Sequence, residues 1–339
     1  MEQNNIDNID SILQIPASLA PMAGFSDPPF RRICFRYGAK YAVSEMISSV
    51  ALVQHSVKTG RLSTIDNEGG PVVLQLFGHD PHIMGEAADM LLSGQFQGCR
   101  YFSDPAGIDI NMGCPVRKIF SSGDGSALMS SPSTAYEIVR EVRSVCEKYR
   151  VPLSVKFRLG VDESHKNYED FGVSVAEAGA DKLTLHCRTR TQMYSPPAFP
   201  ESCIRLRAAL DSRGLRSVKI CGNGDIVSRT AASVYLNNGC SEVAVGRAAL
   251  SEPWIFKRLL SGSYDPEPGE IISVIKELVE RSCEYYGETT GIRESRSRAA
   301  YLIKGYRGSA RLRNELNHAD SLSEFIKILD GSEMFADHK

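Results

Sequence analysis

The sequence lacks several features that would assign it to a well-known class. None of its 339 residues belong to a run of about 18 apolar residues, the length that a membrane-spanning helix needs. The first ten residues are polar and acidic, whereas a secretory signal is basic and then apolar. The nine cysteines include no Cys-x-x-Cys pair, which argues against a disulfide framework and against a zinc site. We therefore expect a cytoplasmic protein with reduced thiols, no membrane segment and no bound metal.

Neither sign of charge dominates. The formal net charge is −2, so overall composition does not indicate a nucleic-acid-binding protein. Hydrophobic residues make up 42% and charged residues 24% of the chain, which is ordinary for a soluble globular protein. The length suits one large domain with a small one, or two domains of ordinary size.

The most informative stretch surrounds Cys114. Ile108 and Ile110 alternate with polar residues and predict a buried strand, which Asn111 and Gly113 convert into a loop. A lone cysteine is more often a small buried hydrophobic residue. The frame Asn-x-Gly-Cys-Pro instead presents this cysteine at the end of a strand, where parallel α/β proteins bind their ligands.

Short apolar stretches that end in glycine, proline or polar residues recur along the chain. They predict eight strands, at 18–20, 41–43, 72–76, the Ile108 stretch, 153–157, 183–186, 218–221 and 243–245. Apolar residues at helical spacing lie between them, as in 133–149 and 168–178. Their number, order and size predict an α/β fold, the (β/α)8 TIM barrel. A doubly wound open sheet is the alternative, but its Gly-x-Gly-x-x-Gly turn is missing after the first strand.

The chain divides into four predicted segments. Residues 1–15 form a leader, and 16–260 form the barrel. Two prolines and two glycines mark 261–270 as a linker. Residues 271–339 show only helical patterns and predict a small all-helical domain.

Polar residues close several of the predicted strands. Gln75 and Lys156 lie inside apolar strands, and His186 follows another. A buried lysine is costly unless it faces an anion, and a single such residue is as often part of a structural ion pair. Several at successive strand ends indicate one polar ligand at the mouth of a barrel. The turns at 222–225 and 246–247 suit a phosphate group.

A set of motifs stands in one order along the chain, from about Leu19 into the C-terminal helices. Together they resemble the tRNA-dihydrouridine synthases, and the Tyr286-Gly287 tail with its following arginines is most similar to the B-type bacterial branch. The chain departs from the family pattern at Asp124 and at Cys187, where a small residue and a glycine are usual. The motifs are Pro21-Met22-Ala23-Gly24-x-x-Asp27-x-Pro29-Phe30-Arg31, Ser44-Glu45-Met46, Gln75, Asp109-Ile110-Asn111-x-Gly113-Cys114-Pro115, Gly125-Ser126-Ala127-Leu128, Lys156-x-Arg158-x-Gly160, His186-x-Arg188-Thr189, Asn223-Gly224-Asp225 and Gly246-Arg247.

The resemblance implies an FMN-bearing barrel that reduces the C5–C6 double bond of uridine in tRNA, with NADPH or NADH as the reductant. It implies that Cys114 protonates C5 while N5 of the reduced flavin gives hydride to C6. A thiol with a pKa near ~8.5 is protonated at neutral pH, as a proton donor must be. Substrate contacts are expected at Asn111, Arg188, Arg293, Arg296 and Arg298. Cofactor contacts are expected at Pro21, Met22, Ala23, Gln75, Lys156, His186, Asn223, Gly224, Asp225, Gly246 and Arg247.

Residues 292–313 contain seven basic residues and one acidic residue, in a chain of net charge −2. Such a run is most often a solvated helix face. Beside a flavin barrel it is better interpreted as a contact surface for the phosphates of RNA. The substrate uridine would then leave its stack to reach Cys114.

Two other functions stay open at this point. A different FMN barrel oxidoreductase, of the dihydroorotate or dihydropyrimidine type, would explain the polar strand ends but not the basic helices. A non-catalytic tRNA-binding protein on the same scaffold would explain the helices, but it would not need Cys114 and Lys156.

Overall fold

The computed structural model describes residues 14–66, 69–99 and 103–332. Eight parallel strands form a closed barrel in chain order, and β8 pairs with β1. The predicted (β/α)8 barrel is confirmed, while the predicted leader at 1–15 lies almost wholly outside the described residues. The strands are β1 (Ala17–Leu19), β2 (Ala42–Ser48), β3 (Val72–Phe77), β4 (Gly107–Met112), β5 (Leu153–Arg158), β6 (Lys182–His186), β7 (Lys219–Asn223) and β8 (Glu242–Val245).

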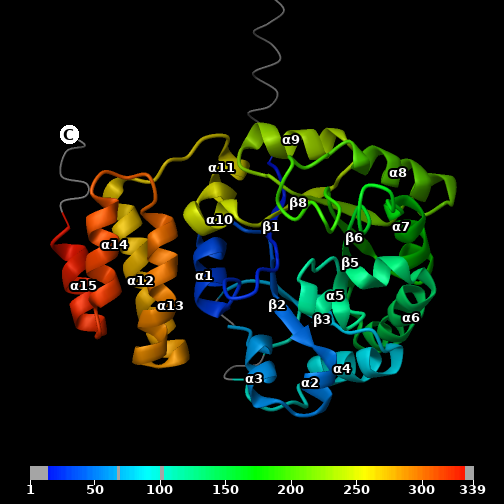
Figure 1. Cartoon of the computed structure of the whole chain (residues 1–339), viewed down its shortest axis with the longest axis horizontal. Coiled ribbons are helices and arrows are strands. Elements are labelled where there is room, and N and C mark those ends of the chain that lie inside the picture. The colour runs from blue at the N-terminus through cyan, green and yellow to red at the C-terminus, as the bar shows by residue number, and fades with distance from the viewer. Residues whose placement is uncertain (1–13, 67–68, 100–102, 333–339) are drawn as a thin grey trace, which may run out of the picture.

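Helices connect the strands and surround the barrel (Figure 1). Helix α8 was not among the predicted helices, although Cys203, Leu206 and Leu210 bury one of its faces. The helices of this part are α1 (Pro28–Arg36), α2 (Ser49–Val53), α3 (Val57–Gly60), α4 (Pro81–Ser93), α5 (Arg117–Ser121), α6 (Pro132–Tyr149), α7 (Tyr168–Glu177), α8 (Ser202–Ser212), α9 (Arg229–Asn237), α10 (Ala248–Ser251) and α11 (Ile255–Ser261), with 3-10 turns η1 (Arg61–Ser63) and η2 (Gly125–Ser130).

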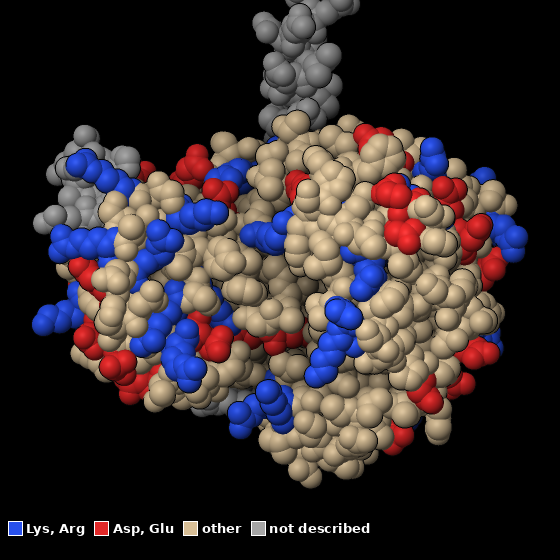
Figure 2. All heavy atoms as spheres, viewed as in Figure 1, with Lys and Arg blue, Asp and Glu red and all other residues tan. Residues whose placement is uncertain are grey.

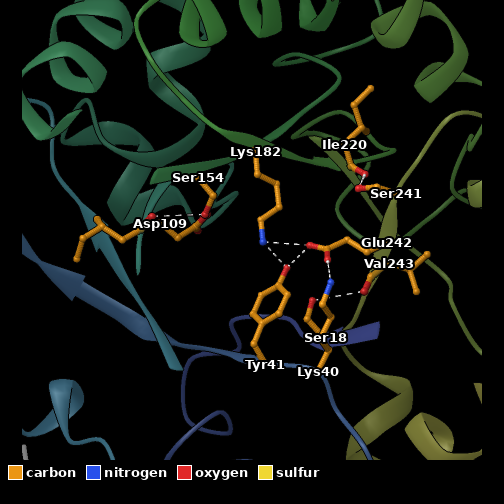
Figure 3. Close-up of polar contacts among 11 residues, drawn as sticks. Ser18, Lys40, Tyr41, Asp109, Ser154, Lys182, Ile220, Ser241, Glu242 and Val243 are labelled. Carbon is orange, nitrogen blue, oxygen red and sulfur yellow. Dashed lines mark hydrogen bonds and ion pairs between the residues drawn. The ribbon is translucent and has the colours of Figure 1, made fainter. Parts of the chain in front are cut away.

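Strand side chains alternate between the surrounding helices and the interior of the barrel. On β4, Ile108 and Ile110 are fully buried in the apolar core, whereas Asp109 makes polar contacts with neighbouring strands. Barrel interiors are usually filled by bulky branched residues. This interior is polar instead: the Nζ of Lys182 lies 3.0 Å from Oε1 of Glu242, and Figure 3 shows the hydroxyl of Tyr41 beside them.

Four further helices follow the barrel and pack beside α1 and α10 (Figure 1). The segment that joins them to the barrel, 262–267, is shorter than the predicted linker at 261–270. Ser261 still belongs to α11, and Pro268 begins the next helix, as proline does at a first helical position. No helix within the described ranges is both long and apolar enough to cross a membrane. These helices are α12 (Pro268–Tyr286), α13 (Glu288–Leu302), α14 (Ser309–His318) and α15 (Leu322–Asp330).

Candidate active site

A cavity of about 730 Å³ opens at the carboxyl ends of the barrel strands. This is the end at which TIM barrels place their active sites, and the volume suits a cofactor-sized ligand. Cys114 and Asn111 line it. The structure also brings all the predicted cofactor contacts to its wall: Pro21, Met22, Ala23, Gln75, Lys156, His186, Asn223, Gly224, Asp225, Gly246 and Arg247.

Side-chain hydrogen bonds hold the backbone of Cys114 at both its N–H and its carbonyl oxygen. Its N–H donates to Oδ1 of Asn111 at 2.9 Å, and its carbonyl oxygen accepts from Oγ of Ser126 at 2.8 Å. Gly125 has φ +58°, and a Cβ there would lie 3.0 Å from Cβ of Cys114, so the following loop needs glycine. Burial raises the pKa of the thiol, against the opposing backbone N–H of Val116. At neutral pH the thiol is therefore protonated and can act as an acid.

Lys156 lies on the cavity wall at the centre of β5. Burial, and then the charge of Arg158, lowers its pKa to about 8. An ammonium group with so low a pKa gains when an anionic or electron-rich group binds beside it. Lys156 thus lies where a ligand in this cavity could meet it, and its contact with a ligand stays a prediction.

A cluster of basic side chains gathers where β6, β7 and β8 end. Arg247 lines the cavity, and its Nη2 donates to Oδ1 of Asp225 at 3.0 Å. Burial alone would raise the pKa of Asp225, but hydrogen bonds from Ala198 and Arg188 lower it overall. Burial, and then the charge of Lys156, lowers the pKa of His186 well below its usual range. This end of the cavity therefore combines a neutral imidazole with an oriented guanidinium, which suits an anion.

Arg188 does not lie on the cavity wall, although it was predicted to contact substrate. Only 1% of its side chain is exposed, and it pairs with Asp225. Its Nε also donates to the carbonyl oxygen of Pro196 at 2.7 Å. Its geometry is that of a residue that holds Asp225 and the 196 region in place behind the site.

Arg158, for which no role was predicted, lines the cavity and is 3% exposed. Its Nε donates to the carbonyl oxygen of Gly113 at 2.8 Å, and its Nη1 to that of Thr189 at 2.9 Å. It thus ties the Cys114 loop to the loop after β6. The signal was present, because residues two apart on a strand share a face and Arg158 follows Lys156 at that spacing.

Aromatic residues at the lip of the cavity were also missed. Tyr194 is 53% exposed, and its ring lies 4.4 Å from the guanidinium carbon of Arg247. On another part of the wall, Phe25 and Tyr301 meet edge to face at 5.7 Å between ring centroids. Tyr301 belongs to α13, so the barrel and the C-terminal helices share the cavity. No short-range pattern in the sequence could have shown this.

The three arginines predicted to bind substrate from α13 have different surroundings. Arg293 is exposed. Arg296 is half-buried and donates from Nη2 to the carbonyl oxygen of Ala319 at 2.9 Å. Arg298 is 3% exposed and forms a 2.7 Å ion pair with Asp27, which is 2% exposed. That placement does not suit a surface contact with phosphate, and Arg298 instead joins α13 to the loop before α1.

Other basic side chains of this region do reach the surface. Figure 2 shows Lys and Arg side chains gathered over the C-terminal helices and near the central hollow of the molecule. Lys304 and Arg313 are among the exposed residues. A basic surface therefore exists in the region 292–313. It includes Lys304 and Arg313, which were not among the three arginines predicted to bind substrate, and it does not include the buried Arg298.

The two departures from the family pattern each have a local partner. Asp124 lies in the loop after Cys114, and its Oδ1 is 2.8 Å from Nδ1 of His79. This contact ties that loop to the one after β3. The Sγ of Cys187 lies 3.7 Å from Sγ of Cys203, within the core. Across the described ranges, no group of three or more His, Cys, Asp or Glu side chains is arranged to hold a metal ion.

Comparison with known proteins finds relatives of this chain by sequence and by structure. The sequence profile of the dihydrouridine synthase family matches residues 18–338. A probable tRNA-dihydrouridine synthase of Treponema pallidum is 31% identical, covering 91% of each chain. The tRNA-dihydrouridine synthase B of Vibrio vulnificus is 32% identical, covering 92% of this chain and 94% of that one. A solved structure of morphinone reductase has a TM-score of 0.49 and 13% identity, covering 77% of this chain and 90% of that one. The resemblance drawn from the motifs is confirmed, and the chain belongs to the dihydrouridine synthase family.

Proposed function

We propose that this protein is an FMN-dependent tRNA-dihydrouridine synthase, which reduces the C5–C6 double bond of uridines in tRNA with electrons from NADPH or NADH. One observation carries the proposal. In a chain of the dihydrouridine synthase family, every predicted cofactor contact meets Cys114 around a single cavity. The alternative FMN oxidoreductases of the dihydroorotate or dihydropyrimidine type would not need the basic surface on the C-terminal helices.

The residues of the cavity fit FMN. His186 and Arg247 provide hydrogen-bond donors and positive charge for the phosphate end. A Cβ at Gly224 would lie 2.8 Å from Cβ of Ala198, so this position has no room for a side chain. Pro21, Met22 and Ala23 supply an apolar wall for the ring system, and Lys156 lines the same cavity. When bound, FMN would supply the hydride that adds to C6 of the uracil ring.

The chain's own groups supply the rest of the chemistry. The Cys114 thiol holds the proton destined for C5, and burial keeps it protonated by raising its pKa. Arg158 and Lys156 place positive charge near the sulfur, which stabilises the thiolate left after proton transfer. Lys156 would also stabilise negative charge on a bound flavin ring.

The lip of the cavity suits an unstacked base. A uridine within tRNA must leave its stack to present C5 to a buried thiol. Tyr194 and Tyr301 offer aromatic surfaces at the entrance, where such a base can stack. Exposed Arg293, Lys304 and Arg313 would bind the phosphates of the surrounding backbone.

Two measurements test the proposal. Denatured protein should release free FMN, and a colourless preparation that takes up no added FMN would contradict the cofactor assignment. Transfer RNA from cells that lack this gene should lose dihydrouridine at one or more positions, and the intact gene should restore it. Unchanged dihydrouridine in every tRNA would contradict the substrate assignment.

A further inference from the structure

A chain of buried side-chain hydrogen bonds runs from the barrel interior to the Cys114 loop. Asp109 is 2% exposed, and its Oδ1 accepts from Oγ of Ser154 at 2.5 Å (Figure 3). Its Oδ2 accepts from Nε2 of Gln75 at 2.6 Å. Oε1 of Gln75 in turn accepts from Nδ2 of Asn111 at 2.9 Å.

The chain ends on backbone amides of the catalytic loop. Oδ1 of Asn111 accepts from the N–H of Gly113 at 3.1 Å and from that of Cys114 at 2.9 Å. These two bonds shape the turn that aims the Cys114 side chain into the cavity. Asn111 must therefore present its oxygen, and not its amino group, to the loop.

The direction of this chain depends on its first member. An amide side chain has nearly the same shape in its two flipped orientations, so packing alone does not choose between them. An ionised carboxylate only accepts hydrogen bonds. It therefore requires the amino group of Gln75, which turns the oxygen of Gln75 toward Asn111. The amino group of Asn111 meets that oxygen, and its own oxygen is left for the loop.

We propose that Asp109 is a positioning residue for the tRNA reaction, whose carboxylate sets the orientation of Gln75 and Asn111 and thereby the backbone of Cys114. The inference rests on the proposed function for its effect on activity, but not for its effect on the loop. Asp109 itself touches neither the thiol nor the cavity wall. It acts through two amide side chains, Gln75 and Asn111, whose orientation must satisfy the carboxylate at one end of the chain and the loop N–H groups at the other.

The substitution Asp109→Asn reverses the orientation required of Gln75, with almost no change in the shape of the side chain at position 109. The amide that replaces the carboxylate keeps one oxygen for Ser154 and turns its amino group toward Gln75. Gln75 must then present its oxygen to position 109 and its amino group to Asn111. If Asn111 keeps its orientation, its amino group faces the amino group of Gln75, and two donors oppose each other. If Asn111 flips, its amino group faces the two loop N–H groups instead.

The first measurement is the alkylation rate of Cys114 by iodoacetamide in flavin-free full-length protein, located by mass spectrometry. Loss of the two loop hydrogen bonds in Asp109→Asn should raise that rate about 5- to 30-fold. Glu242→Gln is the matched control, because it neutralises another buried carboxylate at the base of the same barrel (Figure 3). Its alkylation rate should equal that of the wild type.

The double variant Asp109→Asn with Gln75→Glu supplies the decisive rescue. The carboxylate introduced at position 75 has two acceptor oxygens, so it can accept from both the new amide at position 109 and Asn111. It thereby restores the orientation of Asn111. The alkylation rate should return to the wild-type value, which a merely structural role for Asp109 does not predict.

A further variant covers the case in which Asp109→Asn fails to fold. Gln75→Met breaks the chain of hydrogen bonds at its middle and must raise the alkylation rate in the same way. A wild-type alkylation rate in Asp109→Asn or in Gln75→Met, or no rescue in the double variant, would overturn the inference.

A second measurement links the loop to the reaction. With FMN bound and reduced, Asp109→Asn should oxidise about 10- to 100-fold more slowly than wild type when mixed with unmodified tRNA, because the acid is misplaced. Glu242→Gln should react at the wild-type rate. An inert wild type would contradict the proposed function, whereas an active wild type matched by an equally active Asp109→Asn would contradict this inference alone.

Discussion

The barrel mouth and the C-terminal helices use polar residues in opposite ways. At the mouth, Lys156 and Arg158 are largely buried and line the cavity, and the charge of Arg158 helps to lower the pKa of Lys156. On α13, on α14 and in the segment between them, the basic residues suited to RNA are exposed, whereas the buried Arg298 forms an ion pair with Asp27. A polar residue in an apolar strand is costly and therefore informative, whereas an arginine on a helix says little until its face is known.

The largest expected effect falls on Cys114, the proposed acid at the barrel mouth. Cys114→Ala should leave FMN bound and reducible by NADPH, because that step needs no proton donor on the RNA side. Formation of dihydrouridine in tRNA should slow by about 10²- to 10⁴-fold, the usual contribution of a positioned acid. Cys114→Ser should recover little, since a hydroxyl is a far weaker acid than a thiol. Wild-type dihydrouridine yields from Cys114→Ala, measured by mass spectrometry of digested tRNA, would place the acid elsewhere.

The next effect separates the buried arginine from an exposed one on the same helix. Arg298→Met leaves the buried carboxylate of Asp27 without its cationic partner and should lower the free energy of unfolding by about 3–5 kcal/mol. Arg293→Met is the matched control, and its stability should stay within about 0.5 kcal/mol of wild type because the residue is exposed. Denaturant unfolding measures both. Equal stabilities would mean that the Arg298–Asp27 pair does not hold α13 against the barrel.

The third prediction uses the depressed pKa of Lys156, which is about 8. The ammonium form predominates below that pH and the neutral amine above it. If the charge attracts the cofactor, affinity of the flavin-free protein for FMN should weaken above pH 8, approaching tenfold per pH unit. Lys156→Arg keeps its charge and should show a much flatter profile. Titrations of FMN fluorescence between pH 7 and pH 9.5 check this, and identical profiles for the two proteins would contradict it.

The smallest effect concerns the exposed basic surface. Arg293→Ala, Lys304→Ala and Arg313→Ala should each flatten the dependence of log affinity for tRNA on log salt by about 0.7 to 0.9, if each residue contacts one phosphate. Flavin reduction by NADPH should not change. Glu315→Ala on α14 is the control and should leave the slope unaltered. A triple variant with the wild-type slope would remove this surface from the binding proposal.

The same contrast explains how much of the fold and of the site could be predicted from the sequence. The eight strands were predicted, and the residues predicted to contact a cofactor all line one cavity, because alternation and strand-end polarity are local signals. The place of Tyr301 in the cavity was not, since it depends on how α13 packs against the barrel. Arg298 could have been recognised as buried: Ser295 and Leu302, three residues before it and four after it, lie on the same buried face of α13.

Asp109 shows a further limit of prediction from the sequence. Its position within the predicted strand was evident, and so was its place in the family motif. Its link to Cys114 runs through Gln75 on a neighbouring strand, and it depends on the register that pairs Gln75 with Asp109. That register belongs to the closed barrel as a whole, so it could be known only from the structure.

The account is tested most directly by mixing pre-reduced, FMN-loaded wild-type protein with tRNA in the absence of NADPH, and following flavin absorbance in a single turnover. Unmodified tRNA should oxidise the flavin and gain one dihydrouridine for each flavin oxidised, whereas tRNA that already carries dihydrouridine at the target positions should react far more slowly. Equal oxidation rates with the two tRNAs, or oxidation without dihydrouridine, would contradict the claim that this barrel reduces uridine in tRNA.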